Sequence, residues 1–200
     1  MNKKVKMLIW AAALVVVLGG AAWGYRALSQ RMNPSNPFDP PKESSSHSDA
    51  ERPPVPAPDF SLQNAQGEDV TFAELAKGKA VVINFWATWC TYCVQEMPDF
   101  QRVYEEFGDD VLFMMINATD GVNETKTKAR EFIEEKGFTF PIFYDVGIEA
   151  CTAYGVNAFP STVFVNPDGT LAAGIRGQIS EATLREGVEM VRQGADHDKK

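Results

Sequence analysis

Two cysteines three residues apart, Cys90 and Cys93, are the residues whose type and spacing most clearly indicate chemistry. Side chains three positions apart on a helix share a face, so these two sulfurs can close a disulfide. A cysteine at the amino terminus of a helix lies near unpaired backbone N–H groups, which stabilise the thiolate that attacks disulfides. We therefore expect Cys90 to be the nucleophile and Cys93, one turn deeper, to be shielded and to resolve the mixed disulfide.

A pair of this spacing can also be structural or form half of a zinc site, and a zinc ion needs about four ligands. Cys151 is the one further cysteine, while His47 lies in a Pro- and Ser-rich segment and His197 at the end of the chain. We therefore predict no metal and no cofactor. Cys151 has small and apolar neighbours, so we expect a buried residue rather than a third redox thiol.

The flanking sequence indicates which elements position these cysteines. Residues 80–86 form a continuous apolar run rich in β-branched and aromatic side chains, which is typical of a strand buried on both faces. After Cys90, apolar residues recur every three or four positions as far as Phe107, which predicts an amphipathic helix ended by Gly108. Pro98 lies inside this helix and should remove one of its hydrogen bonds.

The rest of the folded part alternates between strands and helices, which indicates the α/β class. Segments 59–62 and 69–72 flank Gly67 and predict a small hairpin. A strong turn signal at residues 167–169 predicts a late hairpin, and therefore a mixed sheet with antiparallel edge strands. Further strands are predicted at 111–116, 141–144, 161–165 and 170–175, and helices at 124–136, 148–154 and 180–192, the last with Ser180 as its N-cap.

The amino-terminal region indicates export and tethering. Three lysines in residues 1–6, expected to stay cytoplasmic, precede an apolar run at 7–25. Nineteen helical residues span roughly 28 Å, close to a hydrocarbon core of about 30 Å, so we expect a transmembrane anchor. A cleaved signal peptide, with small residues at 20–22, is the alternative. The Pro- and Ser-rich residues 26–58 predict a flexible linker before a folded domain at 59–195 and a charged tail at 196–200.

Residues 85–93 (FWATWCTYC), followed by residues 96–98 (EMP), resemble the thioredoxin superfamily. The chain is most similar to the TlpA/ResA-like branch, which is membrane-anchored and extracytoplasmic, and the resemblance covers residues 55–195. It implies a thioredoxin-like fold, with a mixed central β-sheet flanked by helices, an amino-terminal β-hairpin and an inserted helix and strand. It also implies that Pro160 is cis and faces the disulfide.

The resemblance extends to Glu96, one helical turn after Cys93, because ResA-like proteins have a glutamate at this spacing that tunes the proton affinity of the cysteines. A buried carboxylate would disfavour nearby thiolates by like-charge repulsion, or would relay a proton. The alternative is an exposed glutamate on the helix surface. Asn84 stands where cytoplasmic thioredoxins have a buried aspartate, so Glu96 is the expected substitute.

Residues near the cysteines are the expected substrate contacts, namely Trp89, Thr91, Tyr92, Phe159 and Pro160. The family commonly has proline just before the second cysteine, whereas this chain has Tyr92. Because the intervening dipeptide affects the redox potential, the direction of electron flow stays open. Phe159 is bulky for the residue that precedes the cis-proline and would narrow substrate access.

The family resemblance implies a reductant of disulfides in exported proteins, supplied with electrons by a membrane thiol-electron donor. ResA-like relatives reduce apocytochrome c in this way. An oxidase or isomerase of the same fold is the alternative enzyme. A redox-inert binding module or a copper-delivery protein is the alternative of another class, but copper delivery would require C-x-x-x-C and a histidine in the domain.

Two further classes are disfavoured by the sequence. A peroxiredoxin would have P-x-x-x-T-x-x-C, and Thr88 is one residue too close to Cys90. Nucleic acid is not an expected partner, because the formal net charge is -8 and the domain has no basic tract.

Overall fold

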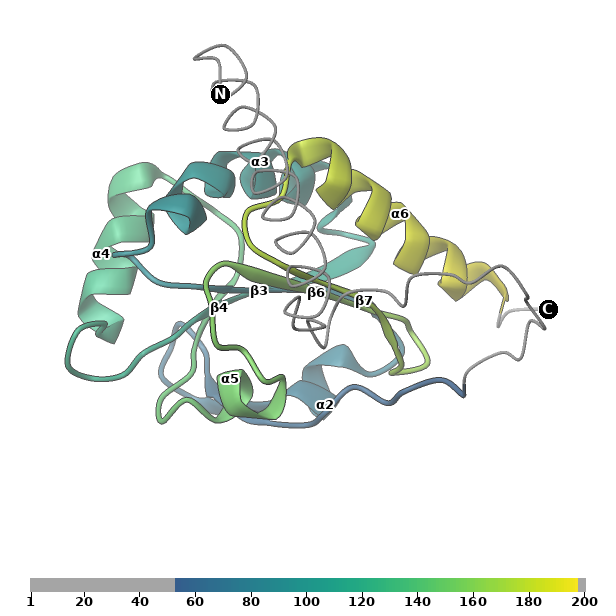
Figure 1. Ribbon diagram of the computed structural model, residues 1–200, viewed down its shortest axis with the longest axis horizontal. Helices are drawn as coiled ribbons and strands as arrows, with labels where there is room; N and C mark the ends of the chain where they lie inside the picture. Colours follow the sequence, from purple (N-terminus) through teal and green to yellow (C-terminus); the bar gives the residue numbers. More distant parts are fainter. Residues whose placement is uncertain (1–52, 198–200) are drawn as a thin grey trace, which may run out of the picture. The chain divides into compact units, whose positions relative to one another are not determined.

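The computed structural model describes residues 53–197, and Figure 1 shows how their helices and strands are arranged. The expected anchor at 7–25 and the expected linker as far as residue 52 lie outside the described residues. Within 53–197, no helix is both long and apolar enough to cross a membrane.

A seven-stranded mixed sheet forms the centre, in the order β2-β1-β5-β4-β3-β6-β7. Strand β3 pairs in parallel with β4 and antiparallel with β6, and the hairpins β1–β2 and β6–β7 form the two edges. The mixed sheet with antiparallel edges is therefore confirmed. The strands are β1 (Ser61–Gln63), β2 (Asp69–Thr71), β3 (Ala80–Trp86), β4 (Val111–Asn117), β5 (Ile142–Tyr144), β6 (Ser161–Val165) and β7 (Leu171–Arg176).

Helices cover both faces of the sheet. The helices are α2 (Phe72–Ala76), α3 (Thr91–Phe107), α4 (Lys126–Lys136), α5 (Glu149–Ala153) and α6 (Glu181–His197). Figure 1 shows α3, α4 and α6 on one face and α2 and α5 on the other. Helix α4 and strand β5 follow β4, which is the inserted helix and strand expected from the sequence.

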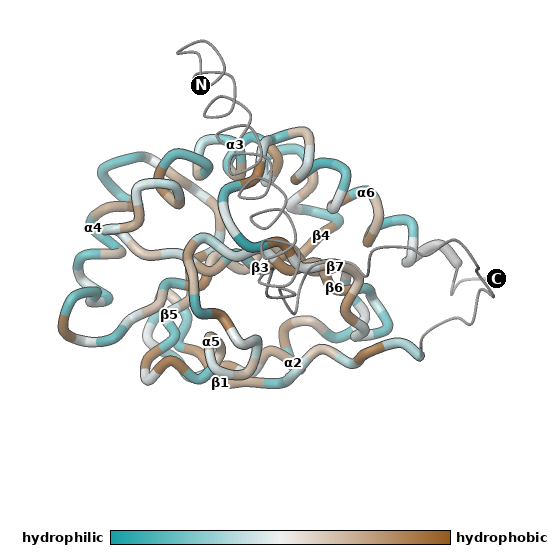
Figure 2. Tube along the Cα trace, viewed as in Figure 1, coloured by the Kyte–Doolittle hydropathy of each residue, from teal (hydrophilic) through white to brown (hydrophobic). Residues whose placement is uncertain are grey.

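Strand β3 is buried along its whole length because alternate side chains enter two different cores. Val82 and Trp86 pack in the core beneath α3, α4 and α6, whereas Ile83 and Phe85 pack in the core with α2 and α5. Figure 2 shows that hydrophobic residues are concentrated in the central strands and alternate with hydrophilic ones along the helices. Each fully buried large side chain contributes about 1.5–3 kcal/mol, so β3 is a rigid support for the residues that follow it.

Several helix boundaries differ from the sequence prediction, and α5 spans Glu149–Ala153 rather than 148–154. Helix α4 begins at Lys126, because the Thr125 side chain caps it by accepting the N–H of Lys128, and the predicted start at Glu124 is wrong. Ser180 caps α6 as predicted, since its Oγ accepts the N–H of Thr183. Helix α6 continues past residue 192 to His197, so the first residues of the expected tail are helical.

The folded part also begins before residue 59. Leu171 N donates a 2.8 Å hydrogen bond to Val55 O, and Ala57 N donates one of the same length to Gly169 O. Pro56 forms an isolated antiparallel bridge with Thr170 between them. The last residues of the expected linker therefore pair with the β6–β7 hairpin, where their backbone groups find partners.

Candidate active site

Cys90 and Cys93 lie at the junction of β3 and α3 and form a disulfide, with their Cα atoms 5.3 Å apart. Cys90 is the N-cap of α3, and the Cys93 N–H donates to its Sγ at 3.2 Å. Cys90 is 6% exposed, whereas Cys93 is completely buried. Both sulfurs are therefore largely buried, and Cys90, at the amino terminus of the helix, is the one that keeps some exposure.

A short turn presents Cys90 after β3 ends at Trp86. Cys90 N donates to Ala87 O at 3.1 Å, and Val94 N then donates to Cys90 O at 3.1 Å as the helix begins. Because Trp86 is completely buried, the start of the turn is fixed. The buried strand therefore delivers Cys90 to a defined position.

Glu96 is completely buried, so an exposed surface glutamate is excluded. Its Oε1 accepts the Asn84 amide at 2.8 Å, and its Oε2 accepts the Ile179 N–H at 2.9 Å. Burial raises the pKa of Glu96 to about 7, although the two hydrogen bonds oppose this shift. The carboxyl group one turn after Cys93 can therefore exchange a proton near neutral pH.

Asn84 joins Glu96 to the strand that follows Pro160. Its Nδ2 donates both to Glu96 and, at 3.1 Å, to Thr162 Oγ1 on β6. The Asn84 Oδ1 atom is buried and has no hydrogen-bond partner within the described part of the chain. A single amide thus connects β3, α3 and β6 behind the cysteines.

The Phe159–Pro160 peptide bond is cis, as the family resemblance implied. Pro160 is buried, whereas Phe159 is partly buried and its ring meets that of Trp89 edge-on at 5.8 Å. Trp89 is 57% exposed and Tyr92 is 63% exposed. The expected substrate contacts around Cys90 thus include two large exposed aromatic side chains.

Cys151 lies on α5, in the core on the opposite face of the sheet from Cys93. It is 1% exposed, and burial together with Asp145 raises the pKa of its thiol. The prediction of a buried cysteine is confirmed. Among residues 53–197, no three His, Cys, Asp or Glu side chains are grouped as metal ligands.

Nothing in the sequence pointed to the buried carboxylate of Glu124, which lies in the loop between β4 and α4. Its Oε1 accepts the Thr88 N–H at 3.0 Å and the Asn117 amide at 2.7 Å, and its Oε2 accepts the Thr88 hydroxyl at 2.6 Å. Glu124 lies beside a charged helix in the sequence, and nothing in that pattern distinguishes it from surface glutamates.

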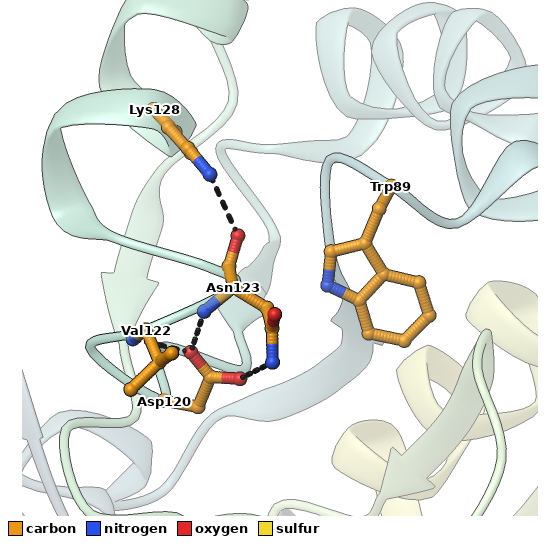
Figure 3. Close-up of a pocket in the computed structure, with 5 residues that line it drawn as sticks. All are labelled: Trp89, Asp120, Val122, Asn123 and Lys128. Atoms are coloured by element: carbon orange, nitrogen blue, oxygen red, sulfur yellow. Dashed lines mark hydrogen bonds between the residues drawn. The ribbon is translucent and has the colours of Figure 1, made fainter.

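An open pocket of about 450 Å³ lies beside Trp89, lined also by Asp120, Val122, Asn123 and Lys128. Figure 3 shows the Trp89 indole on one side and Asn123 on the other. The backbone N–H groups of Glu124 and Val122 donate to Asp120 and lower its pKa to about 2. Asp120 therefore holds its own loop in shape as one wall of the pocket.

Comparison with known proteins agrees with this geometry. The model of the AhpC/TSA family matches residues 54–173, which is more than half of the chain. The chain belongs to the AhpC/TSA family. Its relatives in the family include the thiol-disulfide oxidoreductase ResA of Halalkalibacterium halodurans, which is 32% identical over 140 residues, or 70% of this chain and 77% of the relative. ResA of Bacillus subtilis is 30% identical over 139 residues, or 69% and 75% of the two chains.

A solved structure shows the same architecture. The chain superposes on a thiol:disulfide interchange protein of the thioredoxin family from Chlorobium tepidum with a TM-score of 0.62 and 28% identity, covering 72% of this chain and 99% of that one. The fold is therefore thioredoxin-like, and this AhpC/TSA member is a thiol-disulfide oxidoreductase. Its Cys90–Cys93 disulfide is the oxidised state of such an enzyme.

Proposed function

We propose that this oxidoreductase reduces disulfides in exported proteins, from a domain tethered to the outer side of the cell membrane. The observation behind this proposal is the asymmetry of the two sulfurs. Cys90, on the N-cap of α3, is 6% exposed, while Cys93, one turn further along the helix, is completely buried. This arrangement suits attack by the first sulfur and resolution by the second.

The reaction begins from the dithiol form of the protein. The Cys90 thiolate attacks one sulfur of the substrate disulfide, a mixed disulfide forms, and the other substrate sulfur leaves as a thiolate that takes up a proton. Cys93 then loses its proton and attacks Cys90, which releases the second substrate thiol. Two electrons pass to the substrate, and the protein ends with the Cys90–Cys93 disulfide present in the structure.

Glu96 is the proposed proton acceptor for Cys93. Cys93 is buried and must become a thiolate before it attacks, so its proton needs a nearby acceptor. The pKa of Glu96 is raised to about 7 by burial, so the carboxyl group can accept or return a proton near neutral pH. The charged carboxylate would also oppose a second negative charge on the sulfur.

The substrate is proposed to dock on the surface formed by Trp89, Thr91, Tyr92 and Phe159, with Pro160 beneath it. The exposed aromatic rings supply apolar contact area next to Cys90. Proline lacks an N–H, so Pro160 leaves neighbouring backbone groups free to pair with an extended substrate segment.

The location rests on the amino-terminal sequence. Three lysines followed by the apolar residues 7–25 support a retained anchor with the domain outside the cytoplasm. A reductant in that compartment needs electrons from a thiol donor in the membrane. The resemblance to the ResA-like branch, together with relatives named ResA, makes apocytochrome c the proposed substrate.

The reduction potential of the Cys90–Cys93 pair tests the direction of electron flow. Equilibration with glutathione or dithiothreitol buffers should give a value near that of thioredoxin, about −270 mV. A value near about −120 mV would contradict the proposal and indicate an oxidase. Cys90→Ser should abolish insulin-disulfide reduction, and activity unchanged in that variant would contradict the role of Cys90 as nucleophile. Wild-type protein that reduces no insulin would indicate a redox-inert binding protein instead.

A further inference from the structure

We infer that Glu124 is a positioning residue, which locks the turn before Cys90 against the loop at residues 120–124 and thereby sets how protein substrates dock. This inference rests on the proposed function and adds a determinant of substrate recognition to it.

Three hydrogen bonds converge on the Glu124 carboxylate. Glu124 is completely buried, and both of its oxygens bind Thr88. The Asn117 amide at the end of β4 donates to the same Oε1 atom that accepts the Thr88 N–H. A buried carboxylate without partners would be strongly unfavourable, so these three bonds fix Glu124 and Thr88 relative to each other.

Thr88 is part of the turn that presents Cys90. It lies between Ala87 and Cys90, whose backbone groups close the active-site turn with a 3.1 Å hydrogen bond. Trp89, the next residue, is 57% exposed. Holding both the amide and the hydroxyl of Thr88 therefore restricts the orientation of the Trp89 indole and of the Cys90 sulfur.

The wall of the pocket opposite Trp89 also depends on Glu124. Glu124 N donates to Asp120 Oδ1 at 2.9 Å, and Gly121 N donates to Glu124 O at 2.9 Å, so Glu124 also fixes its own loop. That loop bears Val122, which is 79% exposed and lines the pocket with Trp89. Figure 3 shows this loop across the pocket from Trp89. Both walls of the pocket thus depend on the same buried residue.

One wall of the pocket is Trp89, the residue before Cys90, and this indicates what the two walls contact. A protein substrate whose disulfide lies against Cys90 would place the flanking residues over Trp89 and Val122. A small disulfide reagent would reach Cys90 without touching those walls. Loosening them should therefore weaken binding of protein substrates and leave the chemistry of Cys90 unchanged.

The test uses two pairs of variants in the complete chain. Thr88→Val removes the hydroxyl that binds Glu124 and keeps the branched shape, and Thr88→Ser restores the hydroxyl. Glu124→Ala removes every side-chain bond. Glu124→Gln is its matched control, since its amide oxygen can accept both N–H donors and its NH₂ group can donate to the Thr88 hydroxyl.

Two reactions are measured for each variant, insulin reduction with excess dithiothreitol and the reaction of the reduced protein with dithiobis-nitrobenzoate. For Thr88→Val and Glu124→Ala, KM for insulin should rise about fivefold or more, as for loss of a hydrogen bond to a charged group. Their kcat and the rate and pH profile of the small-reagent reaction should stay within about twofold of wild type. Thr88→Ser and Glu124→Gln should resemble wild type.

Two outcomes would overturn the inference. An unchanged KM in Thr88→Val, with wild type active, means that the contact does not govern docking. An equal fall in both reactions means that Glu124 acts on the thiols themselves. If Glu124→Ala fails to fold, Thr88→Val alone decides. Wild-type protein that reduces no insulin would instead contradict the proposed function. This result is distinct from failure of the inference about Glu124, because it is seen in the wild type before any variant is compared.

Discussion

The Asn84 amide donates a 2.8 Å hydrogen bond to the buried carboxylate of Glu96 and so joins the middle of β3 to the active-site helix. The same amide reaches Thr162 on β6, two residues after Pro160. The two elements that flank the cysteines are thus connected through one side chain. The protonation of Glu96 and the placement of both elements should therefore respond to changes at Asn84.

Glu96→Gln should remove a pH dependence of stability in the oxidised protein. The pKa of Glu96 has its ordinary value of 4.5 in the unfolded chain and is about 7 in the folded protein. Below pH 4.5 both states are protonated, and as the pH rises the unfolded state ionises first, so the folded state loses stability until the pH passes about 7. The free energy of unfolding of wild type should fall by about 3 kcal/mol relative to Glu96→Gln across this range.

Denaturant unfolding of both proteins at a series of pH values measures this difference. Glu131→Gln, at an exposed position on α4, is the matched control and should follow wild type at every pH. A constant difference between wild type and Glu96→Gln from pH 4 to 8 would contradict the raised pKa.

Asn84→Leu should raise the pKa of Glu96 above about 7. The Asn84 hydrogen bond favours the carboxylate and lowers the pKa of Glu96. Without this bond, burial still raises the pKa, and the hydrogen bond from the Ile179 N–H remains to lower it. Thr162→Val is the matched control, because it removes the other acceptor of the Asn84 amide and leaves the bond to Glu96 in place. Carbon-detected NMR titration of the Glu96 carboxyl gives both midpoints, and an unchanged or lower midpoint in Asn84→Leu would be the contrary result.

Cys151 should be inert in the folded protein. Burial raises the pKa of its thiol and keeps reagents away, so iodoacetamide should modify reduced Cys90 and leave Cys151 unmodified until the protein unfolds. Cys151→Ala should retain insulin reduction within about twofold and lose about 1 kcal/mol of stability from the removed buried sulfur. Mass spectrometry of the alkylated protein locates the modified residue, and rapid labelling of Cys151 in the native state would refute this prediction.

The parts of the site that sequence could predict are those built by local patterns. The bounds of strand β3 could be predicted because a short run rich in β-branched and aromatic residues is typical of a buried strand. The position of Cys90 at the start of α3 follows from the change of period after that strand. Cys93 and Glu96 lie one turn apart on the same helix, as their spacing predicts.

The parts that sequence could not predict depend on contacts between distant segments. Thr88 and Glu124 are 36 residues apart, and only the folded chain shows that their side chains meet. Ile179 and Glu96 are 83 residues apart, and the backbone N–H that binds the carboxylate leaves no trace in the sequence. Asn84 was singled out for its place in the family pattern, but its bond to Thr162 could be found only in the structure.

Trapping of the mixed disulfide tests the central claim most directly, namely that Cys90 attacks and Cys93 resolves. Reduced Cys93→Ser protein mixed with a disulfide-containing protein should accumulate a covalent complex through Cys90, visible on a non-reducing gel and located by mass spectrometry. Cys90→Ser protein should form little complex, because Cys93 is completely buried. Equal trapping by both variants, or trapping through Cys93 alone, would contradict the account.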